Sequence, residues 1–506
     1  MKLILFLAAF LAQSCASTAL SVSSSIHGQV FHGGLGRQLL PTGCFVHFYT
    51  QQKLDHFNED DDRVFSQRFI MCSNFTVSDN APVIVYLGGE APEHDDRAFT
   101  SQVYGEFARS VGGVIVSLEH RYYGLSYPAE LPDASTENLK YLSSEQALAD
   151  IKQFILYLKS LQGNQADNAS SPPLKLPYSL ADSKVAVAGG SYPGSLAAWM
   201  KLKHGDVISG AISNSAPVLA QVDFHGIWDV FADNVKVEAI GGSQACFDFW
   251  DNAMYLYASR AMESFSKVPS WLRPCDKKQK RLSAEEASAL AQSVLSSSEV
   301  ITQNYVDFID PRGTQGVRRW CQVAEKYSQE KSGTWKALRD IVYTALKIPA
   351  NSTCIPEGDM PDDSQTNDLS WPVTLDDQSK MAMRLWMYQV CTEFGWLQGF
   401  YGYDRSQPPA WKFMTLYPEF DIQASAKDCS VFGKDFTFDR VENAVEKTNE
   451  IYGGRTLEVT NVTFVNGSTW FKQLARHTHG QILLTSSPMY RSGSVETVRN
   501  PSRRRT

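Results

Sequence analysis

The chain has 506 residues, of which 43% are hydrophobic and 20% are charged, so it has enough apolar material for a globular protein with one large core and room for a second. Its formal net charge of −8 at pH 7 excludes the strongly basic composition of nucleic-acid-binding proteins, and no nucleic-acid partner is expected. Composition alone does not identify the function, so the evidence for it must come from particular segments of the chain.

The N-terminal residues have the pattern of a secretory signal peptide. A lysine precedes an apolar run from Leu3 to Leu11, and small residues follow around Ala16. We predict a signal peptide over residues 1–17. The run is too short to span a bilayer, which takes roughly 20 apolar residues. No later segment is long enough either, so no membrane span is predicted.

The cysteines indicate an oxidising compartment. Nine are present, and removal of Cys15 with the signal peptide leaves eight, the even number that a set of disulfides requires. They form no C-x-x-C pair and no tight cluster with histidine, so neither a metal site nor a cofactor is predicted. Sequons for N-glycosylation fit the same secretory route, and they lie at Asn74, Asn168, Asn351, Asn461 and Asn466.

Strand and helix patterns alternate through the first part of the chain. The β-branched runs at 81–89 and 111–121 predict strands that are buried on both faces, with a short helix at 105–111 between them. A longer helix is predicted over 143–161, where Ser143 and Gln146 have the spacing of a capping box. A third strand follows at 184–190, and this order predicts a mostly parallel sheet.

The composition changes after a further strand predicted within 207–220. From 224 to 399 the chain is rich in aromatic residues and in helical patterns, and strand character returns at 455–467. We therefore predict an α/β sheet domain in two parts, 18–223 and 400–470, with a mainly helical cap inserted at 224–399. A divergent basic tail, which we expect to be disordered, follows at 471–506.

One corner between a strand and a helix has the composition of a nucleophile turn. In the segment VAVAGGSYPGSLAAWMK, residues 185 to 201, Ser191 follows two glycines and precedes a helical pattern rich in Ala and Leu. A tight turn of this kind projects a serine hydroxyl away from the backbone and aims a helix N-terminus at the reacting carbonyl. The G-x-S-x-G motif is broken at its second glycine by Pro193. A serine that only caps the helix is the alternative.

Several motifs resemble the lysosomal-type serine peptidases, the family that includes prolyl carboxypeptidase and dipeptidyl peptidase II. The motifs are AGGSYPGSLAAWMKLKHG, LGGEAPEHDDRAFTSQVYGEFA, SLEHRYYGLSYP, YLSSEQALADI and ISNSAPVLA, and the resemblance covers about residues 45 to 467. It implies an α/β-hydrolase domain that carries a helical cap, with Ser191 as nucleophile. It also implies peptide substrates and an endosomal or lysosomal location, or secretion.

Acyl transfer also needs hydrogen-bond donors for the oxyanion. The natural pair is the N–H of Tyr192, directly after the nucleophile, and the N–H of Gly88 or Gly89 after an early strand. In the EHRYYG motif we interpret Glu119 and Arg121 as a partly buried ion pair that fixes the end of the strand.

The C-terminal segment departs from the family where the rest of a catalytic triad is expected. In the relatives, the last strand runs into an N-G-x-x-D-P-W segment that carries the acid, and a later G-S-H-C-like segment carries the histidine. This chain matches at Asn466 and Gly467, but its last Asp is Asp439. His479 is a candidate base. The interpretation that we favour is an altered C-terminus that lacks both acid and base.

Three hypotheses follow for the function. The resemblance favours a serine exopeptidase that forms an acyl-enzyme on Ser191, with the cap narrowing access to chain ends. A catalytically inactive peptide-binding or regulatory form of the same fold is the first alternative. An esterase or lipase is the second, since the fold alone determines no substrate class, although EHRYYG and GGSYPG match peptidases.

Overall fold

A computed structural model describes most of the chain between residues 44 and 486. The described ranges are 44–73, 78–93, 102–214, 216–238, 241–273, 316–345, 348–356, 378–397, 408–416, 426–454, 462–466 and 482–486, with a few single residues between them. The predicted signal peptide at 1–17 lies outside them.

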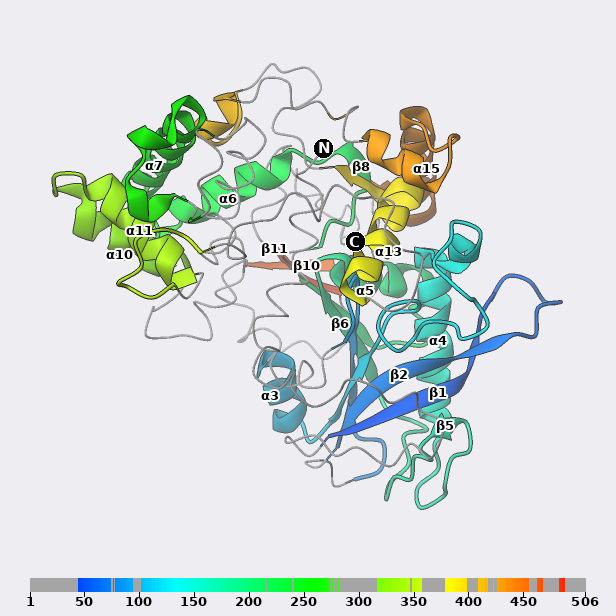
Figure 1. The fold of residues 1–506 in the computed structure, drawn as a ribbon. Helices are drawn as coiled ribbons and strands as arrows, with labels where there is room; N and C mark the ends of the chain where they lie inside the picture. Colours follow the sequence, from blue (N-terminus) through cyan, green and yellow to red (C-terminus); the bar gives the residue numbers. More distant parts are fainter. Residues whose placement is uncertain are drawn as a thin grey trace, which may run out of the picture.

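Nine strands of the described part form one mixed sheet (Figure 1). Its order is β10-β11-β7-β6-β3-β4-β2-β1-β5, and the six strands from β10 to β4 run parallel to one another. The bounds are β1 Phe45–Lys53, β2 Val64–Cys72, β3 Val83–Leu87, β4 Val114–Leu118, β5 Ser170–Ser171, β6 Val185–Gly190, β7 Gly210–Asn214, β10 Val462–Asn466 and β11 Ile482–Ser486. The chain therefore has the predicted α/β-hydrolase architecture.

The helices beside the sheet also follow the sequence patterns. α3 (Gln102–Ser110) lies between β3 and β4, and α4 (Ser144–Ser160) begins after Ser143, whose hydroxyl accepts the N–H of Gln146. The Gln146 side chain does not complete the capping box, because it binds Asp55 and the backbone of His56. Half of the predicted box is thus present.

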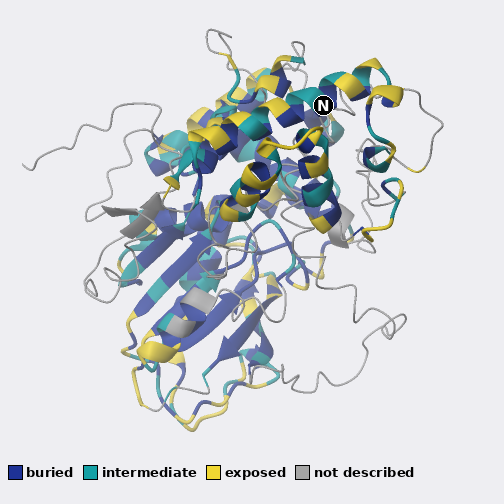
Figure 2. Cartoon of the chain, turned by 90° about the vertical axis from the view of Figure 1, so that its left-hand side faces the viewer, coloured by how far each residue is buried: buried dark blue, intermediate teal, exposed yellow. Residues whose placement is uncertain are grey.

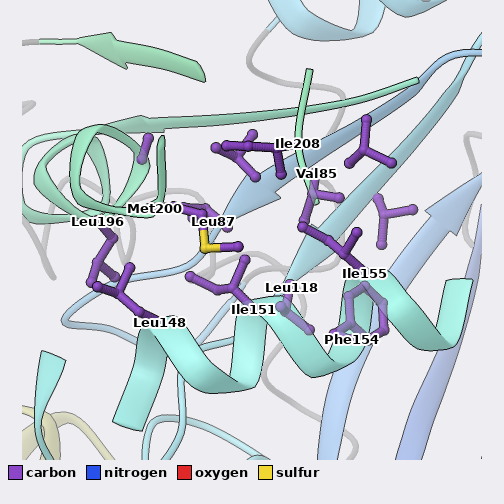
Figure 3. Close-up of a cluster of buried hydrophobic side chains, with 14 of the residues drawn as sticks. Val85, Leu87, Leu118, Leu148, Ile151, Phe154, Ile155, Leu196, Met200 and Ile208 are labelled. Carbon is purple, nitrogen blue, oxygen red and sulfur yellow. The ribbon is translucent and has the colours of Figure 1, made fainter. Parts of the chain in front are cut away.

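The sheet core lies between the central strands and the two helices that cover them. Figure 3 shows side chains of β3, β4, α4 and α5 (Tyr192–His204) pointing toward one another. The set includes Val85, Leu87, Leu118, Ile151, Ile155, Leu196 and Met200, all of them buried. In Figure 2 the central strands are dark blue, so both faces of the sheet are covered, as continuous apolar runs require.

The C-terminal segment contributes more to the sheet than predicted. β11 lies inside the predicted tail at 471–506 and pairs in parallel with both β10 and β7. The expectation of a disordered tail is therefore wrong for residues 482–486. The run ILLTS has the apolar and β-branched composition of a strand, and the basic residues around it obscured this signal.

The inserted helices have a core of their own. α6 (Gly226–Lys236), α7 (Gln244–Glu263), α10 (Gly316–Ser328) and α11 (Gly333–Ala345) lie together on one side of the molecule (Figure 1). Trp250 and Trp320 pack at their centre, with ring centroids 4.6 Å apart. Trp411, beyond the predicted cap, joins this core, whereas α13 (Gln378–Gln389) packs with residues of the sheet side. The domain boundaries stay a prediction.

All eight cysteines of the predicted mature chain are paired, which confirms the disulfide prediction. The pairs are Cys44–Cys72, Cys246–Cys321, Cys275–Cys354 and Cys391–Cys429. Two of the four lie within the helical insertion and one joins the start of β1 to the end of β2.

The sequons differ in their positions. Asn168 and Asn351 are exposed, Asn466 is the last residue of β10, and Asn74 and Asn461 lie outside the described residues. Glycosylation stays a prediction.

Within the described ranges, no helix is long and apolar enough to cross a membrane, and no group of side chains has the composition of a metal site.

Candidate active site

Ser191 lies at the corner where β6 ends and α5 begins. Its backbone has φ 60° and ψ −133°, a conformation that a non-glycine residue adopts only when the surroundings enforce it. The Ser191 N–H donates to the carbonyl of Asn214 on the neighbouring strand, at 3.0 Å. Its hydroxyl does not cap α5, so the capping alternative does not explain this serine.

Glycines on both sides make the turn sterically possible. A Cβ on Gly189 would lie 2.3 Å from the carbonyl oxygen of Pro193, and one on Gly194 would lie 2.7 Å from that of Asn214. Pro193 is the second residue of α5, where the helix needs no N–H from it. The second glycine of the motif is therefore displaced by one residue, from 193 to 194, which explains why the usual pattern is broken.

This geometry predicts different results for two adjacent glycines. Gly189→Ala should lower the free energy of unfolding by about 2–3 kcal/mol, because backbone atoms block the new methyl group. Gly190→Ala is the matched control, since its nearest neighbours are 3.9 Å away, and it should cost under about 1 kcal/mol. Urea unfolding followed by tryptophan fluorescence measures both values. Equal losses would contradict the account of the turn.

The predicted oxyanion donors differ in availability. The N–H of Tyr192 is in the first turn of α5, where helical N–H groups have no partner within the helix. The N–H of Gly88 already donates to the carbonyl of Leu118 at 2.8 Å, so the prediction of Gly88 as an oxyanion donor is wrong. Gly89 packs directly against Pro193, where a Cβ would lie 2.4 Å from the ring. Tyr192 and Gly89 are thus the pair that borders the turn.

Glu119 and Arg121 do not pair with each other, so that interpretation is wrong. Glu119 faces Arg68 of β2 at 3.5 Å, and Arg121 holds both carboxylate oxygens of Asp150 in α4, at 2.6 and 2.7 Å. Residues i and i+2 share a face only in an extended strand, and the chain turns here through left-handed Tyr122. Burial opposes ionisation of Asp150, but Arg121 and His56 together outweigh it and keep the pKa of Asp150 below its usual value.

None of the described histidines is hydrogen-bonded to Ser191. His204 ends α5, roughly 20 Å along the helix from Ser191 at about 1.5 Å per residue. His225 binds Asp223 through Nδ1 at 2.9 Å, and His120 binds the Tyr192 hydroxyl through Nε2 at 3.0 Å. His477 and the candidate base His479 lie outside the described residues.

A carboxyl group that sequence patterns did not single out precedes Phe394, whose ring packs against Tyr192 with centroids 5.2 Å apart. Glu393 belongs to the π-helical segment Val390–Phe394, and its Oε1 accepts the N–H and the hydroxyl of Ser144 at 2.9 and 2.6 Å. Burial raises the pKa of Glu393 to about 7, although the bonds from Ser144 work in the opposite direction. The neighbouring Glu145 raises it further.

Glu393 should make the protein more stable in acid than at neutral pH. Its pKa is raised above the 4.5 that is usual for a glutamate, so its contribution is fully present below pH 4.5 and is lost as the pH rises to about 7. After allowance for partial exposure, the loss is on the order of 2 kcal/mol. Unfolding midpoints measured from pH 4.5 to 8 test this, and Glu393→Gln should remove that part of the slope. An unchanged slope in the variant would contradict the assignment.

Known proteins resemble the chain over most of its length. Residues 52–479 match the family described as serine carboxypeptidase S28. The chain is 30% identical over 451 residues to thymus-specific serine protease of Mus musculus, covering 87% of this chain and 79% of the relative. It is 34% identical over 174 residues to lysosomal Pro-X carboxypeptidase of Bos taurus, covering 34% of this chain and 31% of the relative. Among solved structures, the carboxylesterase EstE1 from a metagenomic library aligns at 13% identity with a TM-score of 0.25, covering 44% of this chain and 59% of that chain.

Proposed function

The chain belongs to the serine carboxypeptidase S28 family, and from that premise we propose that it is a serine exopeptidase whose nucleophile is Ser191. The hydroxyl of Ser191 would attack the carbonyl of a peptide bond near a chain end and form an acyl-enzyme, which water then hydrolyses. The N–H groups of Tyr192 and Gly89 would receive the negative charge on the carbonyl oxygen.

The conformation of Ser191 is the observation that carries this proposal. A non-glycine residue with φ 60° between a central parallel strand and a helix is strained, and such strain concentrates at functional sites. The hydroxyl takes no part in capping α5. Neighbouring residues therefore hold Ser191 in a strained conformation, although its side chain does not stabilise α5.

The relatives and the disulfides support a proposal for substrates and location. Pro-X carboxypeptidase is named as lysosomal, and the four disulfides of this chain fit an oxidising compartment. We infer peptide substrates, entry into the secretory pathway, and an endosomal, lysosomal or secreted destination. The inserted helices would restrict access to the ends of peptides.

A second candidate function has one specific observation in its favour. No described histidine bonds to Ser191, and the sequence after Gly467 lacks the family's acid and histidine segments. A protein with this C-terminal segment would then bind peptides and turn them over slowly, because a serine without its base is a weakly activated alcohol. The EHRYYG and GGSYPG motifs match peptidases, so they favour peptide substrates over the esters of the esterase hypothesis.

Peptides with free and with blocked ends test the proposal. Long incubation at high protein concentration should release residues from one end of a free peptide, and blocking that end should stop the release. The same preparation with Ser191→Ala should release nothing, as measured by mass spectrometry of the products. Cleavage within a doubly blocked peptide, or hydrolysis of esters alone, would overturn the exopeptidase assignment.

A further inference from the structure

Four buried side chains behind the Ser191 turn form one continuous chain of hydrogen bonds. The hydroxyl of Tyr192 lies at its centre, 3.0 Å from Nε2 of His120 and 3.0 Å from Nε2 of Gln389. The hydroxyl of Tyr123 lies 2.8 Å from Oε1 of Gln389. Nδ1 of His120 lies 2.8 Å from the carbonyl oxygen of Arg121. The side chains come from three separate parts of the fold.

Only one direction of hydrogen bonding satisfies all four groups. Nδ1 of His120 faces a carbonyl and must carry the proton, so Nε2 accepts the hydroxyl proton of Tyr192. The Tyr192 oxygen then accepts from the amide of Gln389, whose carbonyl oxygen accepts the hydroxyl of Tyr123. Burial lowers the pKa of His120 to about 4, so the ring stays neutral in acidic compartments. The direction is thus the same at acidic and neutral pH.

The chain of bonds ties the nucleophile turn to two elements at once. His120 and Tyr123 follow β4, and Gln389 is the last residue of α13, directly before the π-helical segment that holds Glu393. The ring of Tyr192 is fully buried and packs against Trp386 and Phe394, with centroids 5.5 and 5.2 Å away. The position of Tyr192 is therefore set from the sheet side and from α13 together.

We propose that Gln389 and His120 are positioning residues that act through the Tyr192 hydroxyl to hold the Ser191–Tyr192 turn in its strained conformation. This rests on the proposed function in one respect, namely that the N–H of Tyr192 is an oxyanion donor. Strain at Ser191 persists only if neighbouring contacts over-determine the backbone, and the anchored side chain of the next residue is such a contact. Loosening it would move the N–H of Tyr192 away from the oxyanion position.

Two substitutions and a matched control separate this role from a general effect on stability. Tyr192→Phe removes the central hydroxyl, and Gln389→Met removes the amide with little change of volume. Tyr157→Phe is the control, because Tyr157 is also buried and its hydroxyl bonds to Asp167 at 2.8 Å, away from the turn. Hydrogen–deuterium exchange of the peptide covering residues 189–195 and the rate of fluorophosphonate labelling are measured in the full chain.

Both test variants should show about tenfold faster exchange in this peptide, and the control should not. Labelling of Ser191 should slow by about tenfold to a hundredfold in the same two variants. Exchange at the wild-type rate in Tyr192→Phe, or an equal rise in the control, would overturn the positioning role. If no protein is labelled but exchange responds as expected, the proposed function fails and the positioning role stands.

Discussion

A protein in which the residues after Gly467 are replaced by a family-like tail should react with a fluorophosphonate probe about 10⁴ to 10⁶ times faster than the chain as written. The replacement carries the D-P-W segment and the histidine segment that this sequence lacks. In a serine triad the histidine accepts the hydroxyl proton and the acid holds its tautomer, so their return should activate Ser191. The rate of adduct formation under excess probe gives the comparison.

The replacement must also preserve the sheet. β11 pairs with β7 from Ile482 opposite Ala211 to Thr485 opposite Asn214, so the new tail has to supply a strand at this place. Ser191→Ala in the chimaera is the control and should abolish the labelling again. Rapid labelling of the unaltered chain that depends on His479 would contradict the prediction, because the existing tail would then supply the base.

The largest loss of stability is expected from breaking the ion pair of Arg121 and Asp150. The two side chains are 0% and 1% exposed, so Asp150→Asn leaves a buried guanidinium without its counter-charge. Removal of one partner from such a pair costs about 3–5 kcal/mol. The same aspartate also binds Nε2 of His56 at 2.7 Å, so the loop after β1 loses a contact as well. Urea unfolding measures the loss.

Two companion variants show whether burial is the cause. Asp233→Asn removes an exposed partner of Lys236, 3.3 Å apart, and should cost about 0.5 kcal/mol or less. A double variant, Arg121→Met with Asp150→Leu, should regain part of the stability, since a buried pair is often replaceable by apolar side chains. If Asp150→Asn cost no more than Asp233→Asn, the ion pair would not hold the end of β4 in place.

The central strands and the serine turn could be predicted because their patterns are local. Strands buried on both faces read as continuous β-branched runs, and this identified β3, β4 and β6. Glycine between such a strand and a helical pattern identified the turn at Ser191. The second glycine at 194 was visible in the sequence, but its role needed the distance from Asn214.

The partners of charged residues could not be predicted, because they depend on where the chain turns. Glu119 and Arg121 are two residues apart, yet they reach β2 and α4 respectively. A signal for Asp150 was present, since it lies three residues after Ala147 and four before Phe154 on the apolar face of its helix. Gln389 and Tyr192 are 197 residues apart, and no local pattern joins them.

Mapping the site of a fluorophosphonate adduct tests the central claim most directly. The full chain and the chimaera are incubated with the probe and digested, and the modified residue is located by mass spectrometry. We predict that the adduct lies on Ser191 in both proteins, slowly formed in the first and rapidly in the second, and that Ser191→Ala prevents it. An adduct on another residue with Ser191 unmodified, or undiminished labelling of the alanine variant, would contradict the assignment of Ser191 as nucleophile.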